Sequence, residues 1–137
     1  MVEMEVLVVG QVQESRDHVL ILREKNGDRM LVIGIGPCEA MAIALPVQDV
    51  HVGRPMTHDL LVAVISRLRG EIRRVVIHDL KADAFIAVLE IDTAMGLMEV
   101  DCRPSDGVAI AVRAGVPIVV TEGVLTQAAV RGERPVE

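Results

Sequence analysis

The chain has very few aromatic residues: Phe85 is the only one, and tryptophan and tyrosine are absent. Proteins that bind single-stranded nucleic acids stack bases on aromatic side chains, so this mode of binding is disfavoured. Lysine and arginine number 14 against 20 acidic residues, and the net charge of −6 argues against a protein that neutralises phosphates with basic side chains. The net charge does not argue against a phosphate-binding site that holds a divalent cation, because the ion reverses the local sign of the charge.

Cysteines are also scarce, and long hydrophobic runs are missing. Cys38 and Cys102 match no zinc-ligand spacing, and we expect both to be buried, reduced side chains outside any disulfide. No apolar run approaches the roughly 18 residues of a membrane span. The first residues lack the basic start and apolar core of a signal peptide. Together these absences predict a cytoplasmic protein with no membrane partner.

The sequence does contain short segments in which apolar and polar residues alternate, and segments with a helical pattern separate them. Asn26-Gly27 lies between two such runs and predicts a hairpin, because both residues tolerate positive φ. Strands are expected at residues 2–12, 19–23, 30–35, 72–78, 85–91, 97–102 and 117–121. Helices are expected at residues 39–45, 56–69, 104–114 and 124–130, the first of them ended by Pro46 and the third by Gly115.

The order of these elements predicts the fold class. Strands come in runs with helices between the runs, which indicates an α+β fold with a mixed, mostly antiparallel sheet packed by three to four helices. No linker or low-complexity tract divides the 137 residues. We therefore expect one domain over residues 1–130 and a frayed tail over residues 131–137.

Two stretches repeat the same chemistry. Residues 54–59 (Arg-Pro-Met-Thr-His-Asp) and residues 103–106 (Arg-Pro-Ser-Asp) each place an arginine, a proline, a hydroxyl and a carboxylate ahead of an apolar segment. Proline is tolerated in the first turn of a helix, where its missing N–H costs nothing. Both stretches are therefore predicted helix starts that carry polar side chains, and any functional site is expected there.

Three carboxylates lie at predicted helix starts: Glu39, Asp59 and Asp106. Each could serve only its own helix, since a carboxylate near a helix N-terminus contributes about 0.3–1 kcal/mol. They could instead converge to hold a divalent cation such as Mg²⁺ or Mn²⁺. The spacing leaves both interpretations open.

The other polar residues of the two stretches are similarly open to two interpretations. His58 could be an ordinary imidazole near a helix start, or a general base or metal ligand. Arg54 and Arg103 could bind phosphate or pair with a neighbouring carboxylate. Thr57 and Ser105 are common helix-start residues, and the sequence shows no base that would activate either hydroxyl.

Three blocks resemble the bifunctional nuclease domain family, in family order and spacing: residues 35–44 (IGPCEAMAIA), 54–61 (RPMTHDLL) and 101–109 (DCRPSDGVA). The resemblance covers about residues 4–126 and implies an α+β domain that self-associates and cleaves DNA and RNA. Cys38 stands where the family often has an aromatic residue, and Gly107 stands where it often has alanine. The polar residues at matching positions are Glu39, Thr57, His58, Asp59, Arg103, Ser105 and Asp106.

Two hypotheses follow. The first is a metal-dependent nuclease, which the resemblance favours. Its catalytic residues would be His58, Asp59, Arg103 and Asp106, its substrate-binding residues Arg54, Thr57 and Ser105, and its Mg²⁺ or Mn²⁺ ligands Glu39, Asp59 and Asp106. The second is a non-catalytic homo-oligomeric module, a dimer or larger, that binds a small anionic ligand or a protein partner. Apolar residues in excess of the core would then form the subunit contact.

Overall fold

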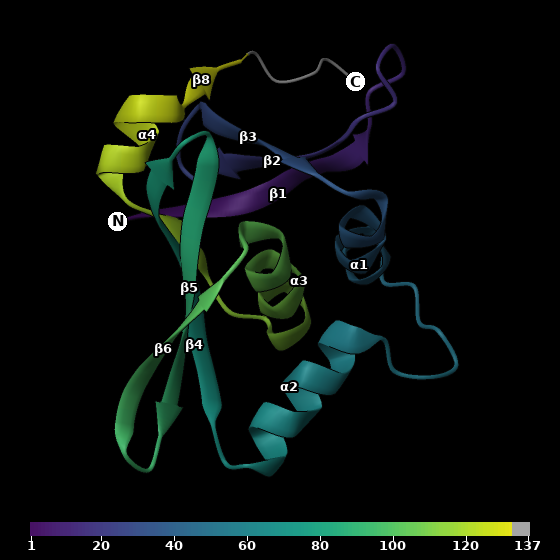
Figure 1. Cartoon of the computed structure of the whole chain (residues 1–137), viewed down its shortest axis with the longest axis vertical. Helices are drawn as coiled ribbons and strands as arrows, with labels where there is room; N and C mark the ends of the chain where they lie inside the picture. Colours follow the sequence, from purple (N-terminus) through teal and green to yellow (C-terminus); the bar gives the residue numbers. More distant parts are fainter. Residues whose placement is uncertain (133–137) are drawn as a thin grey trace.

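The structure is a computed structural model that describes residues 1–132. Over these residues the chain forms one eight-stranded sheet and four helices, which confirms the α+β prediction (Figure 1). The strands are β1 (Val2–Gln11), β2 (His18–Glu24), β3 (Arg29–Ile35), β4 (Glu71–Lys81), β5 (Ala84–Thr93), β6 (Gly96–Cys102), β7 (Ile118–Val120) and β8 (Val130–Arg131). The helices are α1 (Pro37–Val47), α2 (Thr57–Arg67), α3 (Pro104–Ala114) and α4 (Glu122–Ala128).

The sheet is mixed and mostly antiparallel, as predicted. Its strand order is β6-β5-β4-β7-β1-β2-β3-β8, and β4 and β7 form the parallel pair. The β2–β3 hairpin forms around the predicted Asn26-Gly27 turn. The short strand β7 joins the β1–β3 half of the sheet to the β4–β6 half, and the two halves run in different directions in Figure 1.

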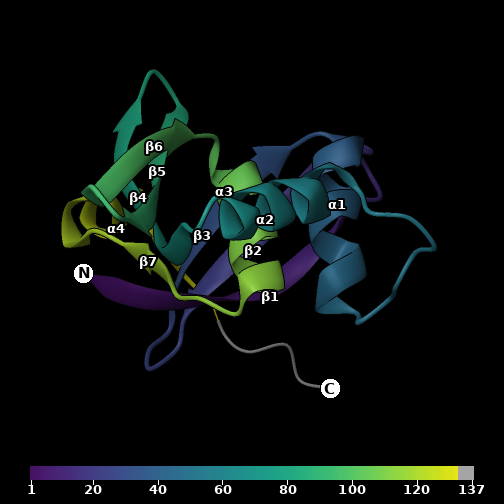
Figure 2. The ribbon, with the colours of Figure 1, turned by 90° about the horizontal axis from the view of Figure 1, so that it is seen from below.

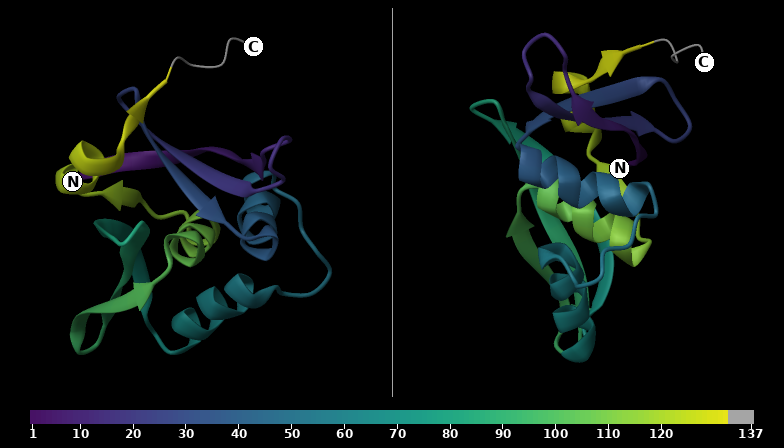
Figure 3. Two further views of the ribbon diagram at one scale, coloured as in Figure 1. Left: turned by 45° about the horizontal axis from the view of Figure 1, so that its top comes forward. Right: turned by 90° about the vertical axis from the view of Figure 1, so that its right-hand side faces the viewer.

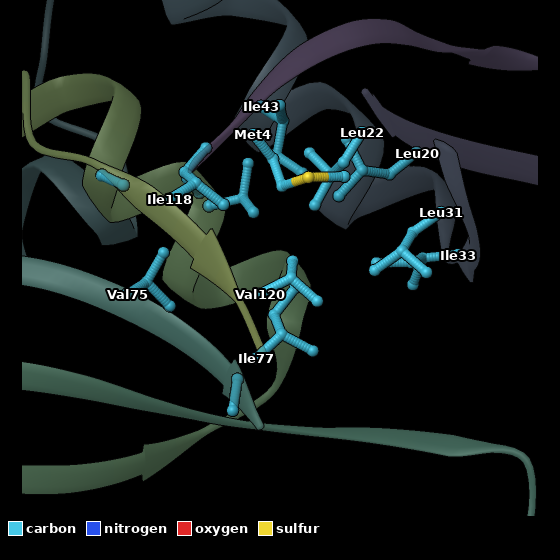
Figure 4. Packing of buried hydrophobic residues seen from close by; sticks show 14 of the residues in the cluster. Met4, Leu20, Leu22, Leu31, Ile33, Ile43, Val75, Ile77, Ile118 and Val120 are labelled. Carbon is cyan, nitrogen blue, oxygen red and sulfur yellow. The ribbon is translucent and has the colours of Figure 1, made fainter. Parts of the chain in front are cut away.

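The core lies where the two halves of the sheet meet the helices. Met4 and Leu20 from β1 and β2, Ile77 and Val120 from β4 and β7, and Ile43 from α1 are all at most 2 % exposed (Figure 4). Within single strands the buried side chains lie two residues apart, as Leu20 and Leu22 do in β2 and Leu31 and Ile33 do in β3, which is expected for one face of a pleated sheet. The alternating pattern in the sequence therefore marks the buried face.

Helix α3 is the central helix of the structure. Figures 2 and 3 show it between the strands β4–β6 and the helices α1 and α2. A Cβ added at Gly107 would lie 2.4 Å from Val75 Cγ2, so α3 approaches β4 too closely for any larger residue without displacement. Gly115 ends the helix in the left-handed conformation, with φ of 67°.

Several element boundaries differ from the prediction. Helix α1 continues through Pro46 to Val47, and Pro55 lies outside α2, which begins at Thr57. Residues Val130 and Arg131 pair with β3 as strand β8, so neither the predicted helix end nor the start of the predicted tail is correct there. Residues 133–137 of that tail lie outside the described residues.

The prediction for one cysteine is also wrong: Cys38 is exposed, because it lies in the first turn of α1 and faces away from the core, whereas Cys102 is half-buried. Both are free thiols. None of the helices in residues 1–132 has the length and apolar character needed to cross a membrane.

Candidate functional site

The starts of α2 and α3 meet, although they are far apart in the sequence. His58, in the first turn of α2, places Nε2 2.8 Å from Oδ1 of Asp106, in the first turn of α3. The pKa of Asp106 is lowered, so this group is an ionised carboxylate that can only accept at neutral pH. The imidazole therefore donates through Nε2, and in the neutral ring Nδ1 is then the acceptor nitrogen.

Arg103 completes this cluster from the residue that caps α3. Its Nε lies 2.8 Å from Asp106 Oδ2 and its Nη2 lies 3.2 Å from Oδ1. Its Nη2 also lies 4.0 Å from Oε2 of Glu39, in the first turn of α1. Three helix starts thus contribute to one polar cluster, which consists of Glu39, His58, Arg103 and Asp106.

Opposing effects set the charge of Asp106. Partial burial raises the pKa of its carboxyl group, but the hydrogen bonds from Arg103 and His58 lower it by more, so the pKa falls below its usual range. The carboxylate is therefore held ionised between a guanidinium and an imidazole. This arrangement fixes the orientation of His58, as the carboxylate partner of a catalytic histidine does.

Asp59 is the neighbour of His58, yet it serves a different purpose. Its Oδ2 accepts the backbone N–H of Met56 at 2.8 Å, and its Oδ1 accepts Nε of Arg113 at 2.7 Å. The N–H of Met56 and then Arg113 lower the pKa of this carboxyl group. Asp59 therefore closes the start of α2 and ties that helix to the end of α3.

Arg113 was missed in the sequence analysis, and it joins three helices. Its side chain is 7 % exposed, and its Nη1 donates to the carbonyl oxygens of Ala42 at 2.7 Å and Ala109 at 2.9 Å. Pro46 has no N–H to donate to the carbonyl of Ala42, four residues earlier. Arg113 supplies the missing donor, which allows α1 to continue past the proline. The sequence contains two signals for this contact: an arginine within the apolar run of α3 and a proline within the apolar run of α1.

The structure separates the remaining predicted residues. Thr57 is exposed and lines the same hollow as His58. Arg54 is exposed in the loop before α2 and lines another hollow, together with Asp59 and Arg113. Ser105 is 6 % exposed and lines a third hollow, between α3 and the strands β2 and β3. Arg54 and Ser105 are therefore not brought to His58.

The residues of the polar cluster line an apolar groove of about 970 Å³. Leu61 and Ile65 of α2 form one wall, and Leu89, Ile91 and Val100 of β5 and β6 form the other. The two cysteines also line it. Burial, and then the charges of Asp106 and Asp101, raise the pKa of the Cys102 thiol to about 11, so this thiol is protonated at neutral pH.

Comparison with known proteins shows which family the chain belongs to. The bifunctional nuclease domain model matches residues 20–133, which confirms the resemblance. The chain belongs to the bifunctional nuclease domain family. Two uncharacterized proteins from two strains of Mycobacterium tuberculosis are each 50% identical over 126 residues, covering 90% of this chain and 75% of theirs. Bifunctional nuclease 2 of Oryza sativa subsp. japonica is 27% identical over 121 residues, covering 85% of this chain and 37% of its own.

The structure does not gather the three carboxylates predicted as metal ligands around one point. Asp59 uses both oxygens for Met56 and Arg113, and both oxygens of Asp106 accept from Arg103 or His58. Among residues 1–132, no group of three or more histidine, cysteine, aspartate or glutamate side chains is placed to hold a metal ion. The donor set of this structure therefore does not fit a divalent ion shared by Glu39, Asp59 and Asp106.

Proposed function

We propose that this domain hydrolyses phosphodiester bonds in DNA or RNA, with His58, Arg103 and Asp106 as its reacting and substrate-binding groups. The observation that supports this proposal most directly is the hydrogen bond between His58 and Asp106. The exposed guanidinium of Arg103 also bonds Asp106 and lies beside it. Membership of the family supports this assignment, as does the name of the rice relative. Glu39 and Thr57 border the same site.

His58 would act as the general base. Its Nε2 is held by Asp106, so Nδ1 would accept a proton from water as the water oxygen forms a bond to phosphorus. The bond from phosphorus to the leaving oxygen then breaks, and the imidazolium returns the proton to that oxygen. Because Asp106 is ionised, it stabilises the positive charge that His58 carries between the two steps.

Arg103 would bind the phosphate. Its Nε and Nη2 are directed to Asp106, and its Nη1 has no hydrogen-bond partner among residues 1–132. The side chain is 64% exposed, so a phosphate can approach it from solvent. A guanidinium hydrogen-bonded to a non-bridging oxygen offsets the charge that develops as water attacks.

Three further expectations belong to this proposal. We keep a requirement for Mg²⁺ or Mn²⁺ as a prediction, without assigning its ligands. We also propose that the domain self-associates and that it works in the cytoplasm.

The second candidate function is the non-catalytic oligomeric module. Two observations favour it: Asp59 and Asp106 both have arginine partners, and the groove beside the polar cluster has mainly apolar walls. In that case His58, Arg103 and Asp106 would bind an anionic ligand without turning it over.

The test is cleavage of single-stranded and double-stranded DNA and RNA by purified protein in Mg²⁺, in Mn²⁺ and in EDTA. We expect His58→Ala and Asp106→Asn to reduce cleavage by about 10²-fold or more, the usual contribution of a general base. His51→Ala is the matched control, since His51 is 88% exposed and lies outside the groove. Equal activity in all four proteins, or none in the wild type, would favour the binding module.

A further inference from the structure

The hollow that Ser105 lines adjoins the polar cluster, and we call it the Ser105 hollow. Its volume is about 720 Å³, which lies within the range of small-molecule sites. Its walls come from the start of α3, from β2 and β3, and from the start of β5. Arg103 and Glu39 line both this hollow and the apolar groove, so the two spaces meet at the guanidinium proposed to bind phosphate.

The single aromatic side chain of the protein, Phe85, lines the Ser105 hollow. It is half-buried, because part of its surface packs against the core and the rest faces the hollow. An aliphatic side chain would cover the core at this position equally well, whereas a ring also offers a flat face for stacking. The hollow therefore has a wall on which a planar group can lie.

The hydroxyl of Ser105 is available on another wall of the hollow. The residue is 6 % exposed, yet its Oγ makes no hydrogen bond with residues 1–132. Oγ is not among the fully enclosed polar atoms that lack a partner, so it meets the open space of the hollow. Buried polar groups are nearly always hydrogen-bonded, and a hydroxyl can both donate and accept. A ligand in the hollow can supply the missing partner.

Acidic side chains outnumber basic ones around the Ser105 hollow. Asp17, Glu39 and Asp83 line it together with Arg103. A phosphate inside the hollow would be repelled by these carboxylates, whereas a neutral ring carries no charge for them to repel. The charges therefore favour a neutral group in the hollow, with a phosphate outside it at Arg103.

We propose that the Ser105 hollow binds the base of a nucleotide whose phosphate lies at Arg103. The base stacks on the ring of Phe85, and the Ser105 hydroxyl bonds an edge of the base. A base inside a duplex is covered on both faces by its neighbours, so the substrate that fits this hollow is single-stranded DNA or RNA. The scarcity of aromatic residues argues against a strand held by several stacked bases, but one ring is enough for one base.

This inference rests on the proposed function, because it uses Arg103 as the phosphate-binding group, and it names the form of nucleic acid that the site takes. It concerns binding and not hydrolysis, so the two proposals fail separately. A protein that cleaves nucleic acid without a base at Phe85 would overturn the base site alone. A protein that binds a base at Phe85 and cleaves nothing would overturn the nuclease alone.

The first test is nuclear magnetic resonance of the full wild-type chain, labelled with carbon-13 in the phenylalanine ring. Phe85 is the only phenylalanine, so its ring protons are observed without overlap. We expect adenosine monophosphate to shift these protons upfield, because a stacked base lies over the ring. Ribose phosphate has the same sugar and phosphate without the base, and it should leave them in place. Equal shifts with both compounds, or no shift with either, overturns the inference.

A short oligonucleotide extends this test to a nucleic-acid strand. As a single strand it should shift the Phe85 ring protons at a lower concentration than adenosine monophosphate does. Annealed to its complement, it should leave them in place. Binding of the mononucleotide alone, or an equal shift with the duplex, overturns single-stranded nucleic acid as the substrate.

Variants test the stacking contact itself. Phe85→Leu keeps an apolar side chain against the core but removes the ring, and we expect the Kd of adenosine monophosphate to rise by about 5-fold to 100-fold. The Kd of ribose phosphate should not change. Phe85→Tyr is the matched control, since it keeps a ring and should bind adenosine monophosphate within about 2-fold of the wild type. Wild-type affinity in Phe85→Leu, or equal losses in both variants, overturns the inference.

Discussion

The starts of α2 and α3 carry a carboxylate at the same helical position, yet the two carboxylates differ in role. Asp59 and Asp106 are each the third residue of their helix, and each is paired with an arginine. The partner of Asp59 is 7% exposed, whereas the partner of Asp106 is 64% exposed. A buried arginine can only hold helices together, while an exposed one can also reach a ligand. Exposure of the arginine therefore separates a structural pair from a candidate site.

Removal of Arg113 should have the largest effect. Arg113→Met leaves Asp59 without its partner and the carbonyl of Ala42 without a donor, so we expect the free energy of unfolding to fall by about 2–3 kcal/mol. Arg103→Met is the matched comparison, and it should cost at most about 1 kcal/mol because that pair is exposed. Urea unfolding at pH 7 measures both. Equal losses would contradict the distinction between the two pairs.

The pH dependence of stability should show a smaller effect, from Asp59. Its pKa is lower in the folded protein than in the unfolded chain. Its contribution is thus fully present above the ordinary aspartate pKa of about 3.9 and is lost as pH falls through the lowered folded value. We expect wild type to exceed Asp59→Ala by about 1 kcal/mol from pH 5 to 7.

That difference should shrink below about pH 4, in the range where the unfolded carboxyl group begins to bind a proton. Urea unfolding at several pH values, with both proteins in the same buffers, measures it. A difference that stayed constant down to pH 2 would mean that Asp59 does not act through its charge.

The smallest expected effect reports on the charge of Asp106. Burial is the main cause of the raised pKa of Cys102, and the charge of Asp106 is the second. Asp106→Asn should therefore lower this pKa by a fraction of a pH unit from its value of about 11, and Asp59→Asn should leave it unchanged. The rate of reaction with a disulfide reagent against pH measures the pKa, in a Cys38→Ser background that removes the exposed thiol. Equal shifts in both variants would contradict a direct effect of Asp106.

Much of the architecture was predictable from local patterns. Alternating residues placed the strands, Asn26-Gly27 placed the β2–β3 hairpin, and Pro104 and Gly115 marked the two ends of α3. These signals depend on the backbone preferences of a few adjacent residues, so they need no tertiary contact. The two-residue strand β8 was missed because its pairing with β3 depends on a distant segment.

The sequence by itself determined the fold class, the family and the three helix starts that hold the polar residues. The tertiary structure decided which residues meet there. In the folded chain His58 bonds Asp106, which is 48 residues away, and Asp59 pairs with Arg113. Arg54 and Ser105 line other hollows. Helix starts depend on neighbours in the chain, whereas side-chain partners depend on how α1, α2 and α3 pack. The same packing lets Arg113 bond the carbonyl that Pro46 leaves free, which no local rule predicts.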